Sequence, residues 1–266
     1  ALLKWHIEMG IDETIAEYPV DNFVPPEPVS TAATGTRYDI ASAPQLKSQA
    51  ARAQAVDTTF TVSPAAVLPS GEASVRSATE LATAAKTFDD LKTALKEFDG
   101  CPLKKTATSI VFAAGNPAGR VLFIGEAPGA EEDRQGKPFV GSSGQLLDKM
   151  LASIDLDRSQ VLISNTVFWR PPGNRTPTTI EAATCLPFIQ RLIELMMPEV
   201  IVTLGGPAAK SLLKQTTGIG KLRGRWFAYT TANLSGPVAA TPLFHPAYLL
   251  RTPAQKRAAW RDLLMI

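Results

Sequence analysis

Cysteine is scarce in this chain, and long apolar runs are missing. Two cysteines among 266 residues cannot form the disulfide framework of a small secreted domain. No apolar run approaches the roughly 18 residues that a membrane-spanning helix needs. Residues 1–6 are soon followed by acidic ones and do not form a secretory signal. We therefore expect a cytoplasmic protein without a membrane partner.

A large net charge is also lacking. The formal net charge is +2, so bulk charge alone does not predict nucleic-acid binding. The distribution is uneven, because acidic residues cluster between Glu8 and Asp21 whereas the segments from residue 170 onward are basic. The basic positions are Arg170, Arg175, Lys221, Arg223, Arg225, Arg251, Lys256, Arg257 and Arg261. They indicate either a basic binding face or an ordinary solvated surface.

Large apolar side chains are few between residues 24 and 76. This stretch is rich in Pro, Ala, Ser and Thr and cannot bury enough surface to offset its ordering entropy, so we predict a largely irregular linker. Residues 1–23 precede it, and an apolar stripe between Leu2 and Ile15 indicates a short amphipathic helix. Residues 77–266 then form the main domain, to which the first 76 residues are an N-terminal extension.

Strands and helices alternate in the main domain. Short apolar runs predict strands at 120–125, 161–165, 200–204 and 238–244. Helical spacing predicts helices at 142–154, 178–196, 207–213 and 253–264, after an earlier one from residue 79 to 100. The earlier helix is expected to break near Thr87, and Thr178 and Glu181 have capping-box spacing. This alternation favours an α/β fold, with a parallel sheet covered by helices on both faces.

Two charged or titratable side chains directly follow predicted strands. Glu126 lies in Gly-Glu-Ala-Pro-Gly at 125–129, and His245 begins His-Pro-Ala-Tyr-Leu-Leu-Arg at 245–251. Loops at the carboxyl ends of parallel strands build ligand sites. There Glu126 could position water or stabilise a developing cation, and His245 could donate to a carbonyl that gains negative charge. The alternatives are a helix-capping or ion-paired glutamate and a structural histidine.

An aromatic ring and an amide occupy two further loop positions. Phe139 lies in Gly-Lys-Pro-Phe-Val-Gly at 136–141, where it could stack on a base or anchor the loop to the core. Asn165 ends the second strand. Its amide complements the O4 and N3–H edge of uracil and mismatches cytosine, although asparagine is also a common turn residue.

Together these residues resemble the family 4 uracil-DNA glycosylases, the thermostable iron–sulfur type. The matching stretches are 125–141, 145–147, 165–177, 200–213, 221–227 and 244–251. The resemblance covers residues 101–264 and does not extend to residues 1–75. It implies a uracil-DNA glycosylase-like fold, with a central four-stranded parallel sheet flanked by helices.

The resemblance also implies site roles, position by position. Glu126 matches the residue next to the catalytic water, and His245 matches the histidine that supports O2 of the leaving uracil. Phe139 matches the ring that stacks on uracil, and Asn165 matches the residue that reads its edge. The remaining base-pocket residues are Gly125 and Ala127. The expected DNA contacts are Arg175, Arg223, Tyr248, Leu249 and Arg251, with Leu249 as a wedge in the base stack and Arg251 on a phosphate.

The sequence departs from this family at its iron–sulfur site. The family holds a four-iron, four-sulfur cluster through four cysteines, and only Cys101 and Cys185 match. Phe98 and Trp169 stand at the other two positions. Four thiolates hold such a cluster, so we predict that the cluster is absent, that no other cofactor is required and that large rings fill its volume. The two cysteines are then expected to be reduced and buried.

The predicted protein is a monomeric, monofunctional DNA repair glycosylase. It flips uracil out of single- or double-stranded DNA and hydrolyses the N-glycosidic bond, leaving an abasic site. One branch of the superfamily cross-links to the abasic sugar through a histidine, where this chain has Asn174, so we expect product release. The alternatives are an inactive DNA-binding or lesion-sensing descendant, a glycosylase for another deaminated base such as hypoxanthine, and a flavodoxin-like phosphate or nucleotide binder.

Overall fold

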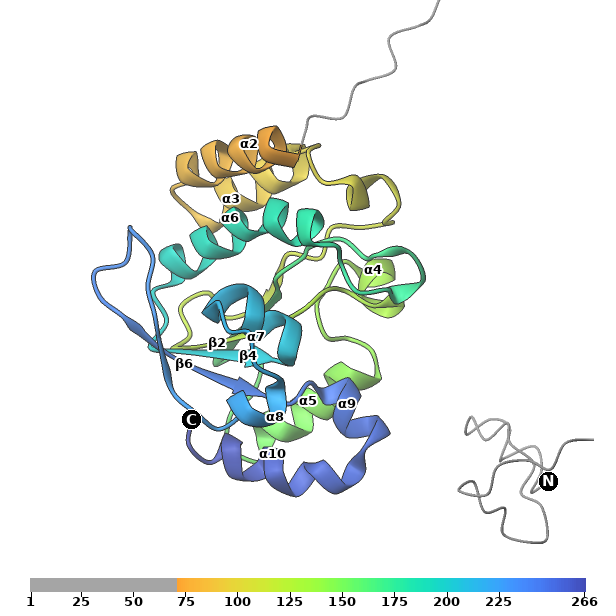
Figure 1. Cartoon of the computed structure of the whole chain (residues 1–266), viewed down its shortest axis with the longest axis vertical. Coiled ribbons are helices and arrows are strands. Elements are labelled where there is room, and N and C mark those ends of the chain that lie inside the picture. The colour runs from red at the N-terminus through yellow and green to blue at the C-terminus, as the bar shows by residue number, and fades with distance from the viewer. Residues whose placement is uncertain (1–70) are drawn as a thin grey trace, which may run out of the picture. The chain divides into compact units, whose positions relative to one another are not determined.

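The computed structural model of the chain describes residues 71–266 (Figure 1). The helix predicted within residues 1–23 and most of the predicted linker lie outside these residues. At its end, the predicted linker overlaps helix α2 (Gly71–Ala84), which already includes residues 71–76. This helix packs against α6 (Thr179–Met196), and its small side chains are buried, which is why a stretch poor in large apolar residues can still be helical here.

The described residues form a six-stranded mixed sheet in the order β1-β3-β2-β4-β6-β5. Its four central strands are parallel, in agreement with the predicted sheet; they are β3 (Val161–Asn165), β2 (Val121–Gly125), β4 (Val200–Leu204) and β6 (Val238–Leu243). Two short strands that the sequence did not predict extend the edges in antiparallel pairing. These are β1 (Ala113–Gly115) beside β3 and β5 (Phe227–Tyr229) beside β6.

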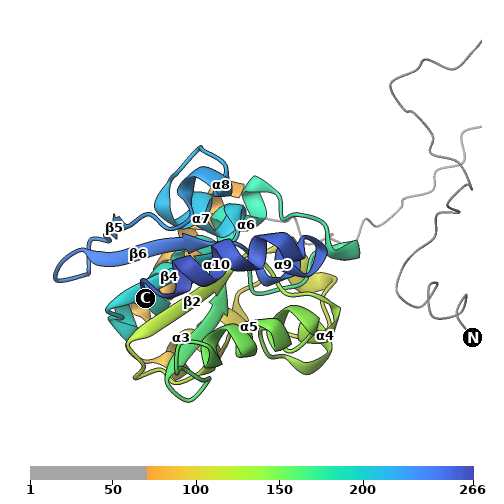
Figure 2. The same ribbon diagram turned by 90° about the horizontal axis from the view of Figure 1, so that it is seen from below.

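The parallel register brings the carboxyl ends of the central strands to one edge of the sheet. Gly125 of β2 lies opposite Asn165 of β3, and Leu204 of β4 lies opposite Leu243 of β6. Figure 2 shows β2, β4 and β6 lying side by side in this order. The loops that follow the four strands therefore meet at one edge, where open α/β sheets bind their ligands.

Hydrophobic side chains pack against both faces of the sheet. Leu122 and Ile124 of β2 join one buried cluster with α2, α3 (Phe88–Glu97) and α6. Phe123 joins a second cluster with α5 (Ser142–Ala152) and α10 (Lys256–Leu263). Figure 1 shows the two groups of helices on opposite sides of the strands. Successive residues of a strand point to opposite faces, so a continuous apolar run serves both clusters.

Polar capping residues fix where α3 and α6 begin. Thr178 Oγ1 accepts from the Glu181 amide at 3.2 Å, and Glu181 Oε2 accepts from the Thr178 amide at 2.7 Å. This confirms the predicted capping box at the start of α6. Thr87 caps α3 in the same way, which confirms the predicted break after α2. Helix α7 (Gly206–Leu213) carries Pro207 in its first turn, as predicted.

Short helices complete the described residues. The α-helical ones are α4 (Ala130–Gln135), α8 (Ile219–Leu222) and α9 (Pro246–Arg251). The 3-10 turns are Pro102–Lys105, Pro172–Asn174 and Pro253–Gln255. The last of these opens the closing helix predicted at 253–264, which continues as α10. No helix within residues 71–266 is long and apolar enough to cross a membrane.

Candidate active site

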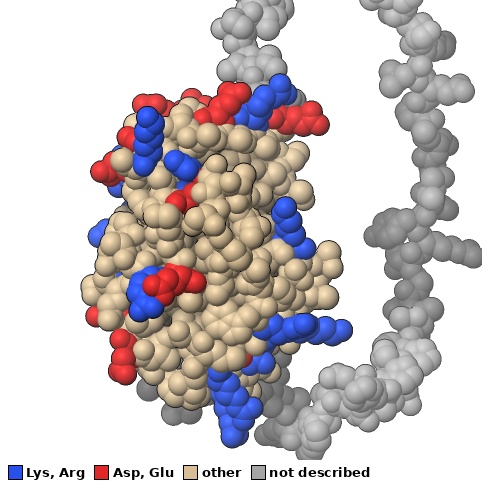
Figure 3. All heavy atoms as spheres, turned by 90° about the vertical axis from the view of Figure 1, so that its left-hand side faces the viewer, with Lys and Arg blue, Asp and Glu red and all other residues tan. Residues whose placement is uncertain are grey.

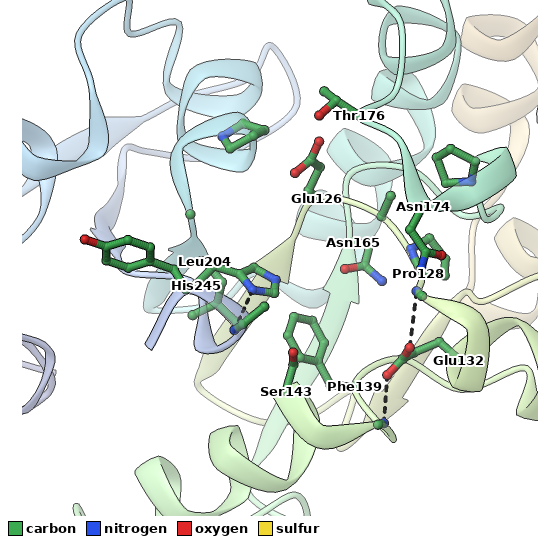
Figure 4. A pocket seen from close by; sticks show the side chains of 18 of the residues that line it. Glu126, Pro128, Glu132, Phe139, Ser143, Asn165, Asn174, Thr176, Leu204 and His245 are labelled. Atoms are coloured by element: carbon green, nitrogen blue, oxygen red, sulfur yellow. Dashed lines mark hydrogen bonds between the residues drawn. The ribbon is translucent and has the colours of Figure 1, made fainter. Parts of the chain in front are cut away.

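A cavity of about 690 Å³ lies at the carboxyl ends of the parallel strands. Its walls come from the loops after β2, β3, β4 and β6, together with the first turns of α5 and α9. Of the residues predicted for the base pocket, Glu126, Ala127, Phe139, Asn165 and His245 all line it (Figure 4). The structure therefore brings together side chains that are up to 119 positions apart (126 to 245) in one concave site.

Phe139 and Asn165 form one wall of the cavity. The Phe139 side chain is 4% exposed, and its ring centroid lies 5.6 Å from that of His245. Asn165 is 2% exposed at the end of β3. Gly125 lies directly behind both, because a Cβ built there would come within 2.7 Å of the Phe139 ring and would also collide with the Asn165 amide. A side chain at position 125 would displace the two groups that were predicted to recognise a base.

Glu126 places a carboxyl group in the cavity wall. Its Oε1 atom is buried and has no hydrogen-bond partner within residues 71–266. Burial raises the pKa of this carboxyl above its ordinary value. A carboxyl group in this state is available to a molecule in the cavity, and once ionised it is a stronger proton acceptor than a solvated glutamate.

His245 is held as a neutral imidazole. Its Nδ1 accepts from the Ala247 amide at 3.1 Å, so in the neutral ring the proton is on Nε2. Removal from solvent lowers its pKa to about 4, and the positive charge of Arg251 contributes to this shift. Nε2–H is therefore a hydrogen-bond donor that needs no protonation near neutral pH. Such a donor can stabilise an oxygen that becomes negative during a reaction.

The predicted DNA-binding arginines have different surroundings. Arg251 is exposed at the end of α9 and lines the mouth of the cavity. Arg175 also lines it, but its guanidinium forms two hydrogen bonds, of 2.6 and 2.8 Å, with Glu181. Arg223 does not line the cavity. It donates twice to Asp262, at 2.7 and 2.8 Å, and once to the carbonyl of Ala258, so it holds α10 instead of facing a ligand.

Helix α9 presents a different leucine from the one predicted. Leu249, the predicted wedge, is 1% exposed and packs in the second hydrophobic cluster in this structure. The next residue, Leu250, is 42% exposed. Tyr248 lines the cavity with its ring packed at 5.0 Å from the ring of Phe244. A helix of six residues has two faces, and the sequence alone did not distinguish them.

Several cavity residues were not predicted as site residues. Ser142 and Ser143 lie at the first turn of α5, Asn174 and Thr176 lie in the loop after β3, and Glu132 lies on α4 (Figure 4). Asn174 has a positive φ of 56°, and its Oδ1 accepts from Arg170. A usable signal existed for the serines, because Gly-Ser-Ser-Gly at 141–144 marks a helix start directly after a loop already assigned to the site.

Charge is mixed away from the cavity. Figure 3 shows the side of the domain that carries the β5–β6 hairpin, where basic and acidic side chains are interspersed on a mostly uncharged surface. That side offers no extended patch of one sign in this view. Arg251 is exposed and lines the cavity, so its positive charge can meet a polyanion that enters there.

The four positions matched to cluster ligands are buried in one hydrophobic cluster. Cys101 and Cys185 are fully buried, as predicted, and Phe98 and Trp169 are 3% and 2% exposed. The two thiols share a hydrogen bond that lowers the pKa of Cys101 and raises that of Cys185. The Phe98 ring packs at 5.2 Å from the ring of Phe188. Two thiols and two aromatic rings do not supply the four sulfur donors that a four-iron cluster requires.

Comparison with known proteins agrees with this arrangement. The family model of the uracil DNA glycosylase superfamily matches residues 112–264. The chain is 37% identical over 175 residues to the type-4 uracil-DNA glycosylase of Pyrobaculum aerophilum, covering 64% of this chain and 88% of that protein. The enzyme of the same name from Thermotoga maritima is 41% identical over 158 residues, covering 59% and 80%. That from Archaeoglobus fulgidus is 38% identical over 172 residues, covering 63% and 85%.

The superfamily match spans more than half of the chain, and the type-4 relatives are matched over most of their own length. The matched region contains β2 to β6 and every predicted site residue. The chain belongs to the type-4 uracil-DNA glycosylases of the uracil DNA glycosylase superfamily.

Proposed function

We propose that this protein excises uracil from DNA by hydrolysing the bond between uracil N1 and the deoxyribose. The products are free uracil and an abasic site. One observation carries the proposal: a neutral Nε2–H donor, a buried ring, an amide and a desolvated carboxyl line a single cavity in a chain of this family. The cavity is walled by folded loops, so a base can enter only after it has left the helical stack.

Base recognition is assigned to Phe139 and Asn165. The Phe139 ring offers a flat face for stacking, which is tolerant of base identity. The Asn165 amide supplies a donor for O4 and an acceptor for N3–H of uracil. Cytosine presents an amine in place of O4 and has no proton on N3, so both contacts would be lost. Gly125 lets both groups pack directly against the backbone because it has no side chain.

His245 is assigned to the leaving group. When the C1′–N1 bond breaks, its electron pair stays with uracil, and negative charge appears on O2. The neutral Nε2–H group can donate to that oxygen without transferring its proton, which stabilises the anion as it forms. The pKa of about 4 supports this role, because the ring stays neutral over the whole range in which DNA glycosylases would work in a cell.

Glu126 is assigned to the sugar, which becomes the abasic site. Loss of uracil leaves positive charge on the sugar, and water must add to C1′ and give up a proton. The Glu126 carboxylate can orient that water, stabilise the cation and take up the proton. Its buried Oε1, which has no hydrogen-bond partner in residues 71–266, supports this assignment.

DNA binding is assigned to the cavity mouth. Arg251 would hold a phosphate, and Leu250 replaces Leu249 as the proposed wedge because it is the exposed leucine of α9. Tyr248 and Arg175 also line the mouth, although Arg175 would have to share its guanidinium with Glu181. We propose that the protein acts as a cytoplasmic monomer on single- or double-stranded DNA and releases its product.

We further propose that the reaction needs no iron–sulfur cluster. The support is the chemistry of the donor set, since Phe98 and Trp169 have no sulfur and are packed into the core. Each step above uses only side chains of this chain and water. Anaerobically purified protein should lack stoichiometric iron and inorganic sulfide, and their presence would overturn this part of the proposal.

The function is tested by a uracil-release assay. Labelled oligonucleotides that contain one uracil, hypoxanthine or cytosine, each single- and double-stranded, are incubated with the protein and then treated with alkali to cleave abasic sites. Cleavage of the uracil strand, lost in His245→Ala, is the expected result. Tight binding without release of uracil would support an inactive descendant, and preferential cleavage at hypoxanthine would change the assigned base.

A further inference from the structure

Phe139 has a backbone conformation that aromatic residues rarely adopt. Its φ is +54°, in the left-handed region, and its ring is nonetheless buried in the cavity wall. A residue that is not glycine occupies this region at an energetic cost, and it stays there only when its surroundings hold it. The contacts that hold the loop at 136–141 therefore decide where the ring lies.

Glu132 holds the loop from one side. Its Oε1 accepts from the amides of Val140 and Gly141 at 2.9 and 2.8 Å, and its Oε2 accepts from the amide of Gly129 at 3.2 Å. Figure 4 shows the carboxylate between the two segments that it joins. Hydrogen bonds to a charged acceptor are stronger than neutral ones. Glu132 thus ties the loop after β2 to the residues that directly follow Phe139.

Arg158 holds the loop from the other side. Its guanidinium donates to the carbonyl of Pro138 at 3.3 Å and to the carbonyl of Phe139, and its Nε donates to Asp148 at 2.7 Å. Asp148 lies on α5, so the arginine is fixed to a helix. The same helix packs tightly on the loop, since a Cβ at Gly144 would overlap the Phe139 carbonyl. Both peptide groups around Phe139 are therefore anchored.

We propose that Glu132 and Arg158 form a loop clamp that positions the Phe139 ring for uracil. Arg158 does not line the cavity, so it does not touch the substrate and acts only through the loop. It is a positioning residue, and so is Glu132 through its contacts with Val140 and Gly141. This inference rests on the proposed function, because it assigns Phe139 to uracil stacking. Through Arg158, base recognition inside the cavity then also depends on a side chain outside it.

The clamp predicts a specific pattern in paired variants. Arg158→Ala should slow single-turnover uracil release by about tenfold to 10²-fold, the cost of misplacing a recognition group by about 1 Å. It should also raise the concentration of free uracil needed to inhibit the enzyme, because that measurement reports the base pocket without DNA. In a Phe139→Ala background, Arg158→Ala should slow release by no more than about twofold further, since the ring it positions is gone.

Conservative variants separate positioning from folding. Arg158→Lys keeps a positive charge beside Asp148 but loses the planar fork, so we expect an intermediate loss of rate and of uracil inhibition with little change in melting temperature. Glu132→Gln keeps one acceptor oxygen and should behave likewise. The matched control is Arg120→Ala, because Arg120 is an exposed arginine that pairs with Glu199 at the other end of β2. This variant should leave both the rate of uracil release and the inhibition by free uracil unchanged.

The outcomes distinguish this inference from the proposed function. If Arg158→Ala and Arg158→Lys keep wild-type release and uracil inhibition, the clamp is refuted. It is also refuted if Arg158→Ala slows the Phe139→Ala enzyme by the same factor as the wild type. In both cases the proposed function stands as long as the wild type releases uracil and Phe139→Ala releases it more slowly. Absence of uracil release by the wild type would instead refute the proposed function.

Discussion

Restoring the two missing cysteines should destabilise the protein when iron is absent. Phe98 and Trp169 are 3% and 2% exposed, so Phe98→Cys and Trp169→Cys each remove a buried ring. Truncation of a buried aromatic side chain costs about 3–5 kcal/mol, and the cysteine sulfur refills a little of the space, so we take about 3 kcal/mol for each. The rings pack on different aromatic partners, Phe188 and Phe168, and we take the two costs as additive, which gives about 6 kcal/mol for the double variant.

Thermal unfolding in the presence of a chelator measures this effect. For a domain of this size, 1 kcal/mol corresponds to about 2–4 °C, so the double variant should melt roughly 12–24 °C below the wild type and each single variant about half as far below. Trp260→Cys is the control, because Trp260 is 42% exposed and its loss should change stability by less than about 0.5 kcal/mol. A double variant that melts within about 2 °C of the wild type without iron would refute the packing argument.

Four further outcomes test the site. His245→Ala should lower single-turnover cleavage by about 10²-fold or more. Because the pKa of His245 is lowered to about 4, the ring gains its proton only below that pH. The wild-type cleavage rate should therefore show no step near pH 6.5. Asn165→Asp should weaken uracil release and permit some cytosine release; unchanged activity on matched oligonucleotides would make Asn165 a turn residue. Leu250→Ala should slow cleavage of duplex DNA more than cleavage of single-stranded DNA. Leu249→Ala should instead lower the free energy of unfolding, measured by denaturant titration, by about 2–5 kcal/mol, because Leu249 is buried. Arg251→Ala should weaken DNA binding and reduce its salt slope by about one, with little change in the rate at saturating enzyme; an unchanged slope would remove the phosphate contact.

The central sheet was predictable because its strands carry strong local signals. The segments 161–165 and 200–204 are short apolar runs, and the structure gives both the predicted bounds. Strands β1 and β5 were missed because each has three residues and no alternating pattern of its own. They are strands because a neighbouring strand offers hydrogen bonds at the sheet edge, and no sequence window contains that information.

Part of the cavity was also predictable, because three of its residues lie at the ends of strands with strong local signals. Glu126 and His245 directly follow predicted strands and Asn165 ends one, so topology alone brought them together. Arg223 could not be judged in this way, because its partner Asp262 lies 39 positions away and is visible only in the fold. The orientation of Leu249 depends on which side of α9 meets the core, and six residues are too few for a periodic pattern to show it.

The spread of the cavity along the chain has a consequence for protein synthesis. Glu126 follows the first central strand of the chain, whereas His245 follows the last one. Strand β6 must pair with β4 before the histidine can reach the other groups. A nascent chain still lacking β6 would therefore have no glycosylase activity, however well its first half had folded. Recovery of uracil release during refolding would report the arrival of the final parallel strand and not the earlier collapse of the core.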